Sequence, residues 1–152
     1  MQAKGPLKKY FAYGSNMDPG RMRLRGICFS SRTKAILRDW VLVFNKIKKD
    51  SSSVGYANIE PAPNACVEGI LYEVADICKL DPFEGVPTHY KRSTLNIEVD
   101  GGLSTAEVYI AVPQKTLPGL KPTKDYLAHL IAGSDLLSAD YAAKLKETPT
   151  VD

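Results

Sequence analysis

Alternation of apolar and polar residues is clearest in the second half of the chain, where it predicts an antiparallel hairpin. Residues 94–99 place three apolar side chains on one face: Leu95, Ile97 and Val99. Residues 105–112 do the same with four: Ala106, Val108, Ile110 and Val112. A period of two is typical of strands. The Asp-Gly-Gly sequence at 100–102 between them is a typical hairpin turn.

Other apolar segments predict strands at residues 10–13, 27–37, 41–47, 56–59 and 67–74. Residues 40–44 are the most apolar run and predict a central core strand. The turn-like Arg38-Asp39 is expected to separate the second strand from the third, and Pro61 and Pro63 to end the fourth. Residues 46–53, rich in lysine and serine, predict an exposed, mobile loop.

Helical spacing and capping residues predict four helices. Asp18 as N-cap and Pro19 at the first position predict a short helix that ends at Gly26. Residues 75–80 allow a turn or two before Asp81-Pro82 interrupts them. Residues 123–132 and 138–147 predict two closing helices, with 113–122 irregular before them. Strands followed by helices indicate a largely antiparallel α+β domain.

Length and composition restrict the class of protein. A chain of 152 residues with a net charge of +3 fits a single domain, 1–152, with an ordinary core. The first seven residues are too short for a signal peptide, and no apolar run approaches a membrane span. Three widely spaced cysteines and two distant histidines give no support to a zinc site. We therefore expect a cytoplasmic protein.

Residues 9–18 contain the first candidate for chemistry. An aromatic strand runs into Gly14-Ser15-Asn16, a cluster that allows tight, positive-φ backbone, and then into the helix start at Asp18-Pro19. Such a connection can align successive backbone N–H groups around an anion. The alternative is an ordinary strand-to-helix connection.

Residues 80–87 contain the second candidate. Glu84 lies between Phe83 and Gly85 in a segment bounded by prolines, so Phe83 and Val86 could partly desolvate its carboxylate. Desolvation would raise the pKa of Glu84 toward the range useful for proton transfer. The alternative, which composition alone favours, is an exposed turn acid. Asp81 is interpreted as a local turn or cap residue.

The two candidate segments resemble the γ-glutamylcyclotransferase-like family. The resemblance rests on Tyr-Gly-Ser-Asn-Met at 13–17 after an aromatic strand, and on Leu80-Asp81 followed by Glu-Gly-Val at 84–86. The order and separation of the two motifs also fit. Asn58 and the closing helix pair fit as well, so that the resemblance covers about residues 9–148.

The resemblance implies a small mixed, largely antiparallel β-barrel flanked by helices, with a pocket at its mouth. It implies that the loop carrying the Tyr-Gly-Ser-Asn motif binds substrate through Tyr13, Gly14, Ser15, Asn16 and Met17. The family's catalytic glutamate corresponds to Glu84. A tyrosine at the start of the following strand corresponds to Tyr90, and one opening the penultimate helix to Tyr126. The alternative for both tyrosines is a core or rim aromatic.

The reaction that the family implies needs few protein groups. In a γ-glutamyl compound the α-amine can attack the γ-carbonyl and close the five-membered ring of 5-oxoproline. Because the nucleophile belongs to the substrate, no Ser-His-Asp or Cys-His pair is needed, and neither a metal nor an organic cofactor is expected. One carboxylate of raised pKa can take a proton from the α-ammonium and give one to the departing amine. Glu84 is the candidate.

Three functions are compared. The first is an enzyme that releases 5-oxoproline from a γ-glutamyl amino acid, amine or peptide, and the second is a binding module that keeps the pocket without cyclisation. The third is nucleic-acid binding through basic residues such as Arg21, Arg23 and Arg25, whose spacing instead favours a solvated helix face. We expect a small-molecule γ-glutamyl substrate, no nucleic-acid or membrane partner, and compatibility with a homodimer. The sequence leaves the identity of the leaving amine open. Residues 46–53 and 113–122 are expected to determine which amine is accepted.

Overall fold

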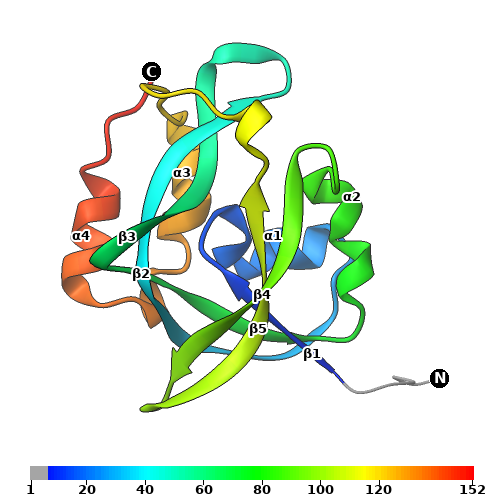
Figure 1. Cartoon of the computed structure of the whole chain (residues 1–152). Helices are drawn as coiled ribbons and strands as arrows, with labels where there is room; N and C mark the ends of the chain where they lie inside the picture. Colours follow the sequence, from blue (N-terminus) through cyan, green and yellow to red (C-terminus); the bar gives the residue numbers. More distant parts are fainter. Residues whose placement is uncertain (1–6) are drawn as a thin grey trace.

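Five strands close into a barrel in the order β1-β3-β2-β4-β5 (Figure 1). The computed structural model describes residues 7–152, so the interpretation of the first six residues lies outside the described part. The strands are β1 (Lys8–Ala12), β2 (Phe29–Lys48), β3 (Ser51–Val74), β4 (Tyr90–Val99) and β5 (Gly102–Ala111). All pairings are antiparallel except the one between β1 and β5, which closes the barrel. The predicted mixed, largely antiparallel α+β fold is confirmed.

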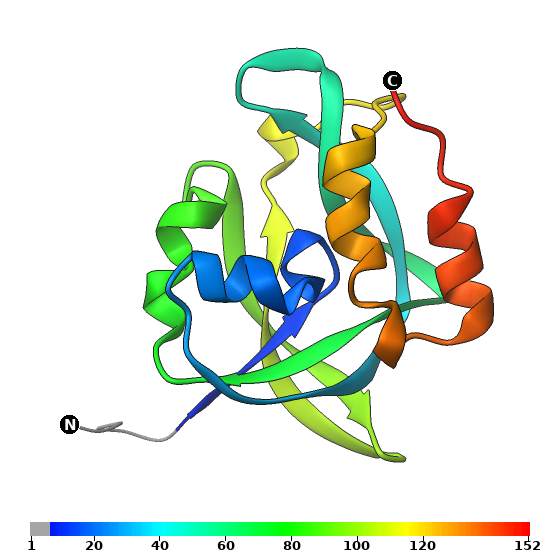
Figure 2. The ribbon, with the colours of Figure 1, turned by 180° about the vertical axis from the view of Figure 1, so that it is seen from behind.

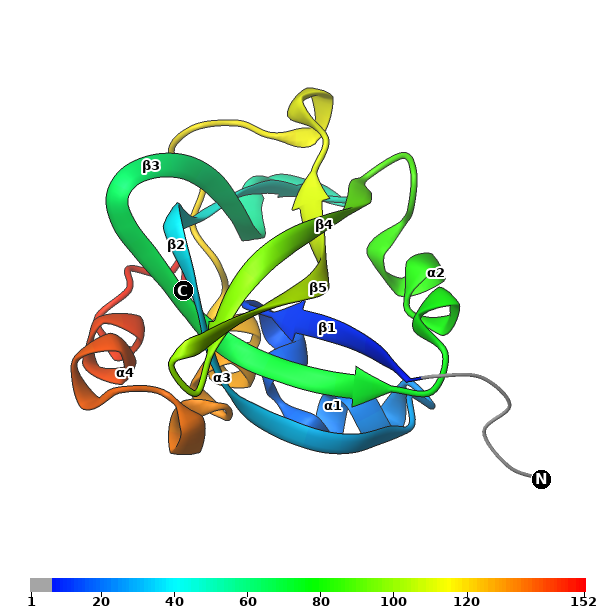
Figure 3. The ribbon, with the colours of Figure 1, turned by 60° about the horizontal axis from the view of Figure 1, so that its bottom comes forward.

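Helices cover the outside of the barrel. They are α1 (Pro19–Leu24), α2 (Asp81–Glu84), α3 (Lys124–Ile131) and α4 (Ala139–Lys146). Short 3-10 turns connect them: η1 (Ser15–Met17), η2 (Ile77–Lys79), η3 (Pro113–Lys115) and η4 (Ser134–Leu136). From behind, α1 and α3 flank the η1 turn (Figure 2). Seen from below, α2 and α4 lie on opposite sides of the barrel (Figure 3).

The predicted helix starts are confirmed by side-chain caps. The Asp18 carboxylate accepts from the Gly20 amide at 2.9 Å, and Pro19 occupies the first position of α1. The Thr123 hydroxyl caps α3 and the Ser138 hydroxyl caps α4. Each cap accepts a backbone N–H that has no partner within its helix.

The predicted breaks in the strands are wrong, because β2 and β3 run through them as bulges. Arg38-Asp39 is not a turn between two strands: Asp39 has φ 69° at a shift of register within β2. Pro61 does not end a strand, since it pairs with Trp40 inside the ladder. The extra residues of β3 are absorbed next to it, where Asn64 has φ 68°. Bulges of this kind accommodate turn-forming residues without ending the pairing.

The segment beyond the bulge also differs from expectation. Residues 40–44 are only partly buried, so they are not the central core strand. Residues 46–53 are not a loop, because β2 continues to Lys48 and β3 begins at Ser51. Lys46 is 3% exposed: its ammonium donates to the Ile47 carbonyl at 2.6 Å and lies over the rings of Tyr56 and Tyr90. Those contacts remove Lys46 from solvent.

The predicted hairpin is confirmed as β4 and β5. Its register pairs Ile97 with Ser104 and Val99 with Gly102. Asp100 and Gly101 form the turn with φ 49° and 77°. Two successive positive φ angles match the right-handed twist of a two-residue hairpin.

Hydrophobic side chains form two clusters on opposite faces of the sheet. One cluster contains Tyr10 and Tyr72 together with Leu127 and Leu130 of α3, so it lies between strands and helices. The other is made of strand residues with Tyr13, including Phe11, Leu71, Ile97 and Val108. Neighbours along β1 and β3 therefore point to different clusters, as the alternation of a strand requires.

Gly69 is a position where a side chain has no room. A Cβ there would collide with the Ala12 carbonyl oxygen and lie 2.8 Å from the Phe11 ring. We expect Gly69→Ala to lower the free energy of unfolding by roughly 1–3 kcal/mol, the usual cost of overpacking, as measured by urea denaturation. Gly102→Ala is the control, since its nearest neighbour would be 3.8 Å away. Equal urea midpoints for the two variants would contradict the prediction.

Within the described residues no helix combines the length and the apolar character needed to cross a membrane.

Candidate active site

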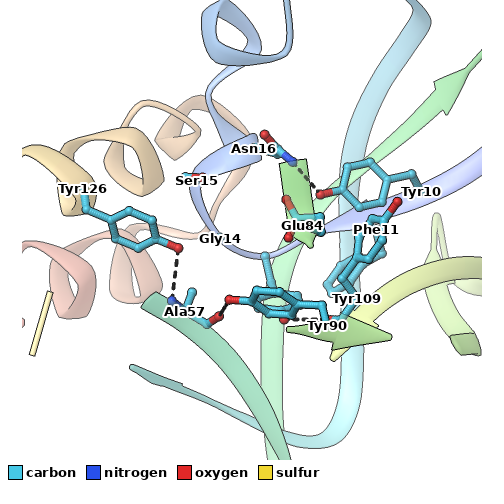
Figure 4. Close-up of a pocket in the computed structure, with 11 residues that line it drawn as sticks. Tyr10, Phe11, Gly14, Ser15, Asn16, Ala57, Glu84, Tyr90, Tyr109 and Tyr126 are labelled. Carbon is cyan, nitrogen blue, oxygen red and sulfur yellow. Dashed lines mark hydrogen bonds between the residues drawn. The ribbon is translucent and has the colours of Figure 1, made fainter. Parts of the chain in front are cut away.

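One cavity brings the two sequence motifs together (Figure 4). Of the predicted residues it is lined by Tyr13, Gly14, Ser15, Asn16, Glu84, Tyr90 and Tyr126. Four residues that were not predicted as site residues complete the lining: Tyr10, Phe11, Ala57 and Tyr109. The space in it that the centre of a water-sized sphere can reach is about 30 Å³.

Met17 is the predicted site residue that does not line the cavity. Its side chain is fully buried in the cluster between barrel and helices. Its amide donates to the Gly14 carbonyl at 3.0 Å and closes the η1 turn. Met17 therefore supports the turn and presents no group to a ligand.

The turn leaves main-chain donors without a partner inside it. Gly14 is the residue before η1, and a short helix leaves its first N–H groups, here those of Ser15 and Asn16, without partners inside it. Gly14 has φ −114°, so the expected positive φ is absent. Glycine allows close approach instead: a Cβ would lie 3.1 Å from that of Ala57, a tight contact, and 3.5 Å from the Tyr126 hydroxyl.

Glu84 is the last residue of α2, not part of an irregular loop. Asp81-Pro82 begins this helix instead of interrupting one, because proline is tolerated in a first turn. Gly85 then ends it with φ 64°. Asp81 is more than a cap: its carboxylate accepts from the Tyr109 hydroxyl at 2.7 Å and pairs with Arg92 at 3.2 Å. The two contacts fix α2 against β4 and β5.

The Glu84 carboxylate is largely withdrawn from solvent, with its side chain 17% exposed. Burial raises the pKa of Glu84, and the positive charges of Arg25, Arg21 and Lys46 oppose that increase without cancelling it. The closest of these charges is Arg25, whose Nη1 lies 3.5 Å from Oε2 of Glu84. A carboxyl whose pKa is raised by burial is suited to taking up a proton and returning it.

The arginines of α1 do not form one solvated face. Arg23 is exposed, as expected, whereas Arg21 and Arg25 are partly buried. Arg21 lies 3.3 Å from Nε2 of His129, whose Nδ1 is 2.8 Å from the Asp18 carboxylate. These contacts hold α1 against α3 beside the cavity.

Three tyrosine hydroxyls of the cavity already donate their proton in a hydrogen bond to the protein. The Tyr90 hydroxyl donates to the Ala57 carbonyl at 2.7 Å. The Tyr13 hydroxyl donates to the Tyr109 carbonyl, and the Tyr109 hydroxyl to Asp81. Because a hydroxyl carries one proton, these three can only accept from a ligand.

Tyr126 and Tyr10 differ, because their hydroxyl oxygens accept hydrogen bonds from the protein. The Tyr126 oxygen accepts from the Ala57 amide at 3.0 Å, and the Tyr10 oxygen from Nδ2 of Asn16 at 3.0 Å (Figure 4). Neither hydroxyl proton has an acceptor among residues 7–152. Burial raises the pKa of both phenols, so the protons stay in place at neutral pH. Two hydroxyl donors therefore face the cavity.

The sequence pattern missed several of these groups. Arg25 and Lys46 were assigned to solvent, and Tyr10 was noted only as part of an aromatic strand. Alternation along the strand predicts that Tyr10 and Phe11 lie on opposite faces. No residue pattern near them indicates which of the two faces is turned toward Glu84. That relation depends on how β1 and α2 are placed in the barrel.

A change of stability with pH should accompany the raised pKa of Glu84. Because the folded pKa exceeds the unfolded one, the carboxyl's contribution to stability is complete below the unfolded pKa and is lost as the pH rises through the folded pKa. We expect Glu84→Gln to gain stability relative to the wild type as the pH rises from about 4, near the unfolded pKa, to the folded pKa of Glu84. Urea midpoints across this range measure it, and a difference independent of pH would contradict it.

Comparisons with known proteins show the family and the fold of the chain. The family model described as γ-glutamyl cyclotransferase, AIG2-like, matches residues 10–128. A search of curated proteins found no match. A solved structure named γ-glutamyl cyclotransferase is 26% identical, with a TM-score of 0.82 over 96% of this chain and 90% of that one.

Two further structures are similar. A human protein described as uncharacterized is 26% identical, with a TM-score of 0.83 over 97% of this chain and 91% of that one. A yeast γ-glutamyl cyclotransferase specific to glutathione is 12% identical and shows the shared fold alone, with a TM-score of 0.71 over 94% of this chain and 95% of that one. The family match supports activity of this general type. The chain belongs to the γ-glutamyl cyclotransferase, AIG2-like family.

Proposed function

We propose that this protein releases 5-oxoproline from a γ-glutamyl amino acid, amine or peptide. The observation that carries the proposal is the shared cavity of Glu84 and the η1 turn, which come from distant parts of the chain. A proton-exchanging carboxyl faces main-chain donors there, and the reaction needs both. The three cysteines are free and exposed, which is consistent with a reducing cytoplasm.

In the proposed mechanism Glu84 acts twice. Its carboxylate first takes a proton from the substrate α-ammonium, and the resulting amine attacks the γ-carbonyl carbon. A C–N bond then forms to close the ring, with the negative charge on the γ-carbonyl oxygen and a second proton still on the ring nitrogen. The ring nitrogen loses that second proton to solvent, and as the carbonyl re-forms the bond to the departing amine breaks while Glu84 returns its proton to the departing nitrogen. Well-oriented intramolecular attack removes up to roughly 7–11 kcal/mol of the barrier, so holding the substrate bent is a large part of the task.

The remaining groups of the cavity would meet negative charge on the substrate. Two such charges arise, the α-carboxylate and the oxyanion that forms on the γ-carbonyl oxygen. The amides of Ser15 and Asn16 and the hydroxyl of Tyr126 are the donors assigned to them. The hydroxyls of Tyr13 and Tyr90 already donate to backbone carbonyls. They would therefore shape the cavity or accept a hydrogen bond from the α-ammonium.

The test is direct detection of product. The protein is incubated with γ-glutamyl-alanine, with γ-glutamyl amines and with γ-glutamyl peptides, and 5-oxoproline is quantified by chromatography. Product above the uncatalysed rate is expected with at least one of the three classes. If calorimetry shows tight binding of these compounds while no product forms, the protein is a binding module and the proposal is wrong.

A further inference from the structure

Arg25 contacts both motifs of the cavity. Its Nη1 donates to Oδ1 of Asn16 at 3.0 Å and lies 3.5 Å from Oε2 of Glu84. Its guanidinium also lies over the Phe83 ring, 4.9 Å from the centroid. The side chain is 15% exposed. One side chain therefore connects the η1 turn with α2.

The contact with Arg25 fixes the orientation of the Asn16 amide. A guanidinium can only donate, so the atom that faces Arg25 must be the amide oxygen. The NH₂ group is then directed to the Tyr10 hydroxyl, 3.0 Å away. The backbone of Asn16 is held as well, since its carbonyl accepts from the Tyr72 hydroxyl at 2.6 Å. Asn16 is 3% exposed, which leaves its amide no alternative partner in bulk water.

The orientation of Asn16 in turn determines what Tyr10 can do. A hydroxyl that accepts from an NH₂ group keeps its own proton for another acceptor. Tyr10 and Glu84 both line the cavity, and Figure 4 draws Glu84 next to the hydrogen bond between Asn16 and Tyr10. Without Arg25 the Asn16 amide could turn its oxygen toward Tyr10, which would draw the phenolic proton away from the cavity.

We propose that Arg25 is a positioning residue that holds the Glu84 carboxylate directly and, through Asn16, keeps the Tyr10 hydroxyl as a proton donor in the cavity. The inference rests on the proposed function for what Glu84 does to the substrate. It adds Arg25 and Tyr10 to the residues on which that function depends.

Other charged and titratable groups also face Glu84 and must be considered. The cations are Arg21 of α1, Arg25 at the end of that helix, and Lys46 of β2. The phenols are Tyr10, Tyr13, Tyr90, Tyr109 and Tyr126. Among the cations only Arg25 is paired with the Glu84 carboxylate in the described residues, and the pKa of Glu84 responds to it most strongly after burial. Loss of Arg25 should therefore move the titration of Glu84 to higher pH.

The test compares Arg25→Met with Arg25→Lys. Arg25→Met keeps the length of the side chain but removes every donor and the charge, and kcat for γ-glutamyl-alanine should fall on the order of 10²-fold. The acid limb of the kcat/KM profile should shift to higher pH. Arg25→Lys keeps a positive charge but lacks the planar guanidinium. The pH of its acid limb should therefore be closer to the wild-type value than its kcat is. Arg23→Met, in the last turn of α1 and exposed, is the matched control and should change neither kcat nor the acid limb.

Tyr10→Phe tests the second part of the chain of contacts. In the wild-type background it should lower kcat, whereas in the Arg25→Met background the further loss should be smaller, because the proton is already diverted. Equal losses in the two backgrounds would overturn the link through Asn16.

A readout independent of turnover separates this inference from the proposed function. The ¹³C signal of the Glu84 carboxyl is identified by its absence in Glu84→Gln and titrated in each variant. A shift to higher pH in Arg25→Met but not in Arg23→Met supports the role of Arg25, even if the wild type forms no 5-oxoproline and the proposed function fails. Wild-type titration and wild-type kcat in Arg25→Met would overturn it.

Discussion

Glu84→Gln is expected to lower kcat for 5-oxoproline release by roughly 10²- to 10⁴-fold, the usual contribution of a general acid–base group. Glutamine has nearly the same shape and can fill the same place beside Arg25, but it cannot take a proton from the α-ammonium. The measurement is the initial rate of 5-oxoproline formation at saturating γ-glutamyl-alanine. Unfolding in urea verifies that the variant is folded.

Glu98→Gln is the matched control for that loss. Glu98 lies in β4 and pairs with Arg38 on the surface, at 2.8 Å, and it does not line the cavity. The same chemical change there should leave kcat within about twofold of the wild type, because surface substitutions away from special features have small effects. A Glu84→Gln variant as active as Glu98→Gln would exclude Glu84 as the acid–base group.

Tyr126→Phe is expected to lower kcat by roughly 10²- to 10³-fold, as does loss of one donor to a developing oxyanion. The reason is the direction of its hydrogen bond. Its oxygen accepts from the Ala57 amide, so the proton is left for the substrate. Initial rates of 5-oxoproline formation measure the loss.

Tyr90→Phe provides a closely matched comparison, because each of the two tyrosines makes one bond to the backbone of Ala57. Each variant should lose about 1 kcal/mol of stability for that bond. Only Tyr126 has a proton left to donate, so kcat should fall much less in Tyr90→Phe. Equal losses of kcat in the two variants would mean that the direction of these hydrogen bonds does not decide function.

Local patterns were sufficient for the elements whose causes are local. The β4–β5 hairpin follows from a period of two and a turn that accepts positive φ, and α1, α3 and α4 follow from their N-caps. The aromatic strand before Gly14 also follows from composition, since β1 spans Lys8–Ala12. In each case the residues that cause the structure lie within a few positions of it.

Local patterns failed where pairing partners are distant. Arg38-Asp39 and Pro61 are turn signals, yet the β2–β3 ladder continues through both because bulges absorb the extra residues. Lys46 lies in a segment whose composition is typical of an exposed loop, yet its ammonium lies over the rings of Tyr56 and Tyr90. Tertiary contacts of this kind override propensity, which is only a weak preference.

The chain by itself determined which residue types could do the chemistry: a glutamate beside a glycine, and a turn of small residues before a helix. Only the tertiary structure decided that Glu84 faces Gly14, Ser15 and Asn16 across one cavity, because α2 and η1 meet only when the barrel closes. It also decided which tyrosine protons are free. Hydrogen-bond direction depends on partners from other strands and helices, and a linear sequence does not contain that information.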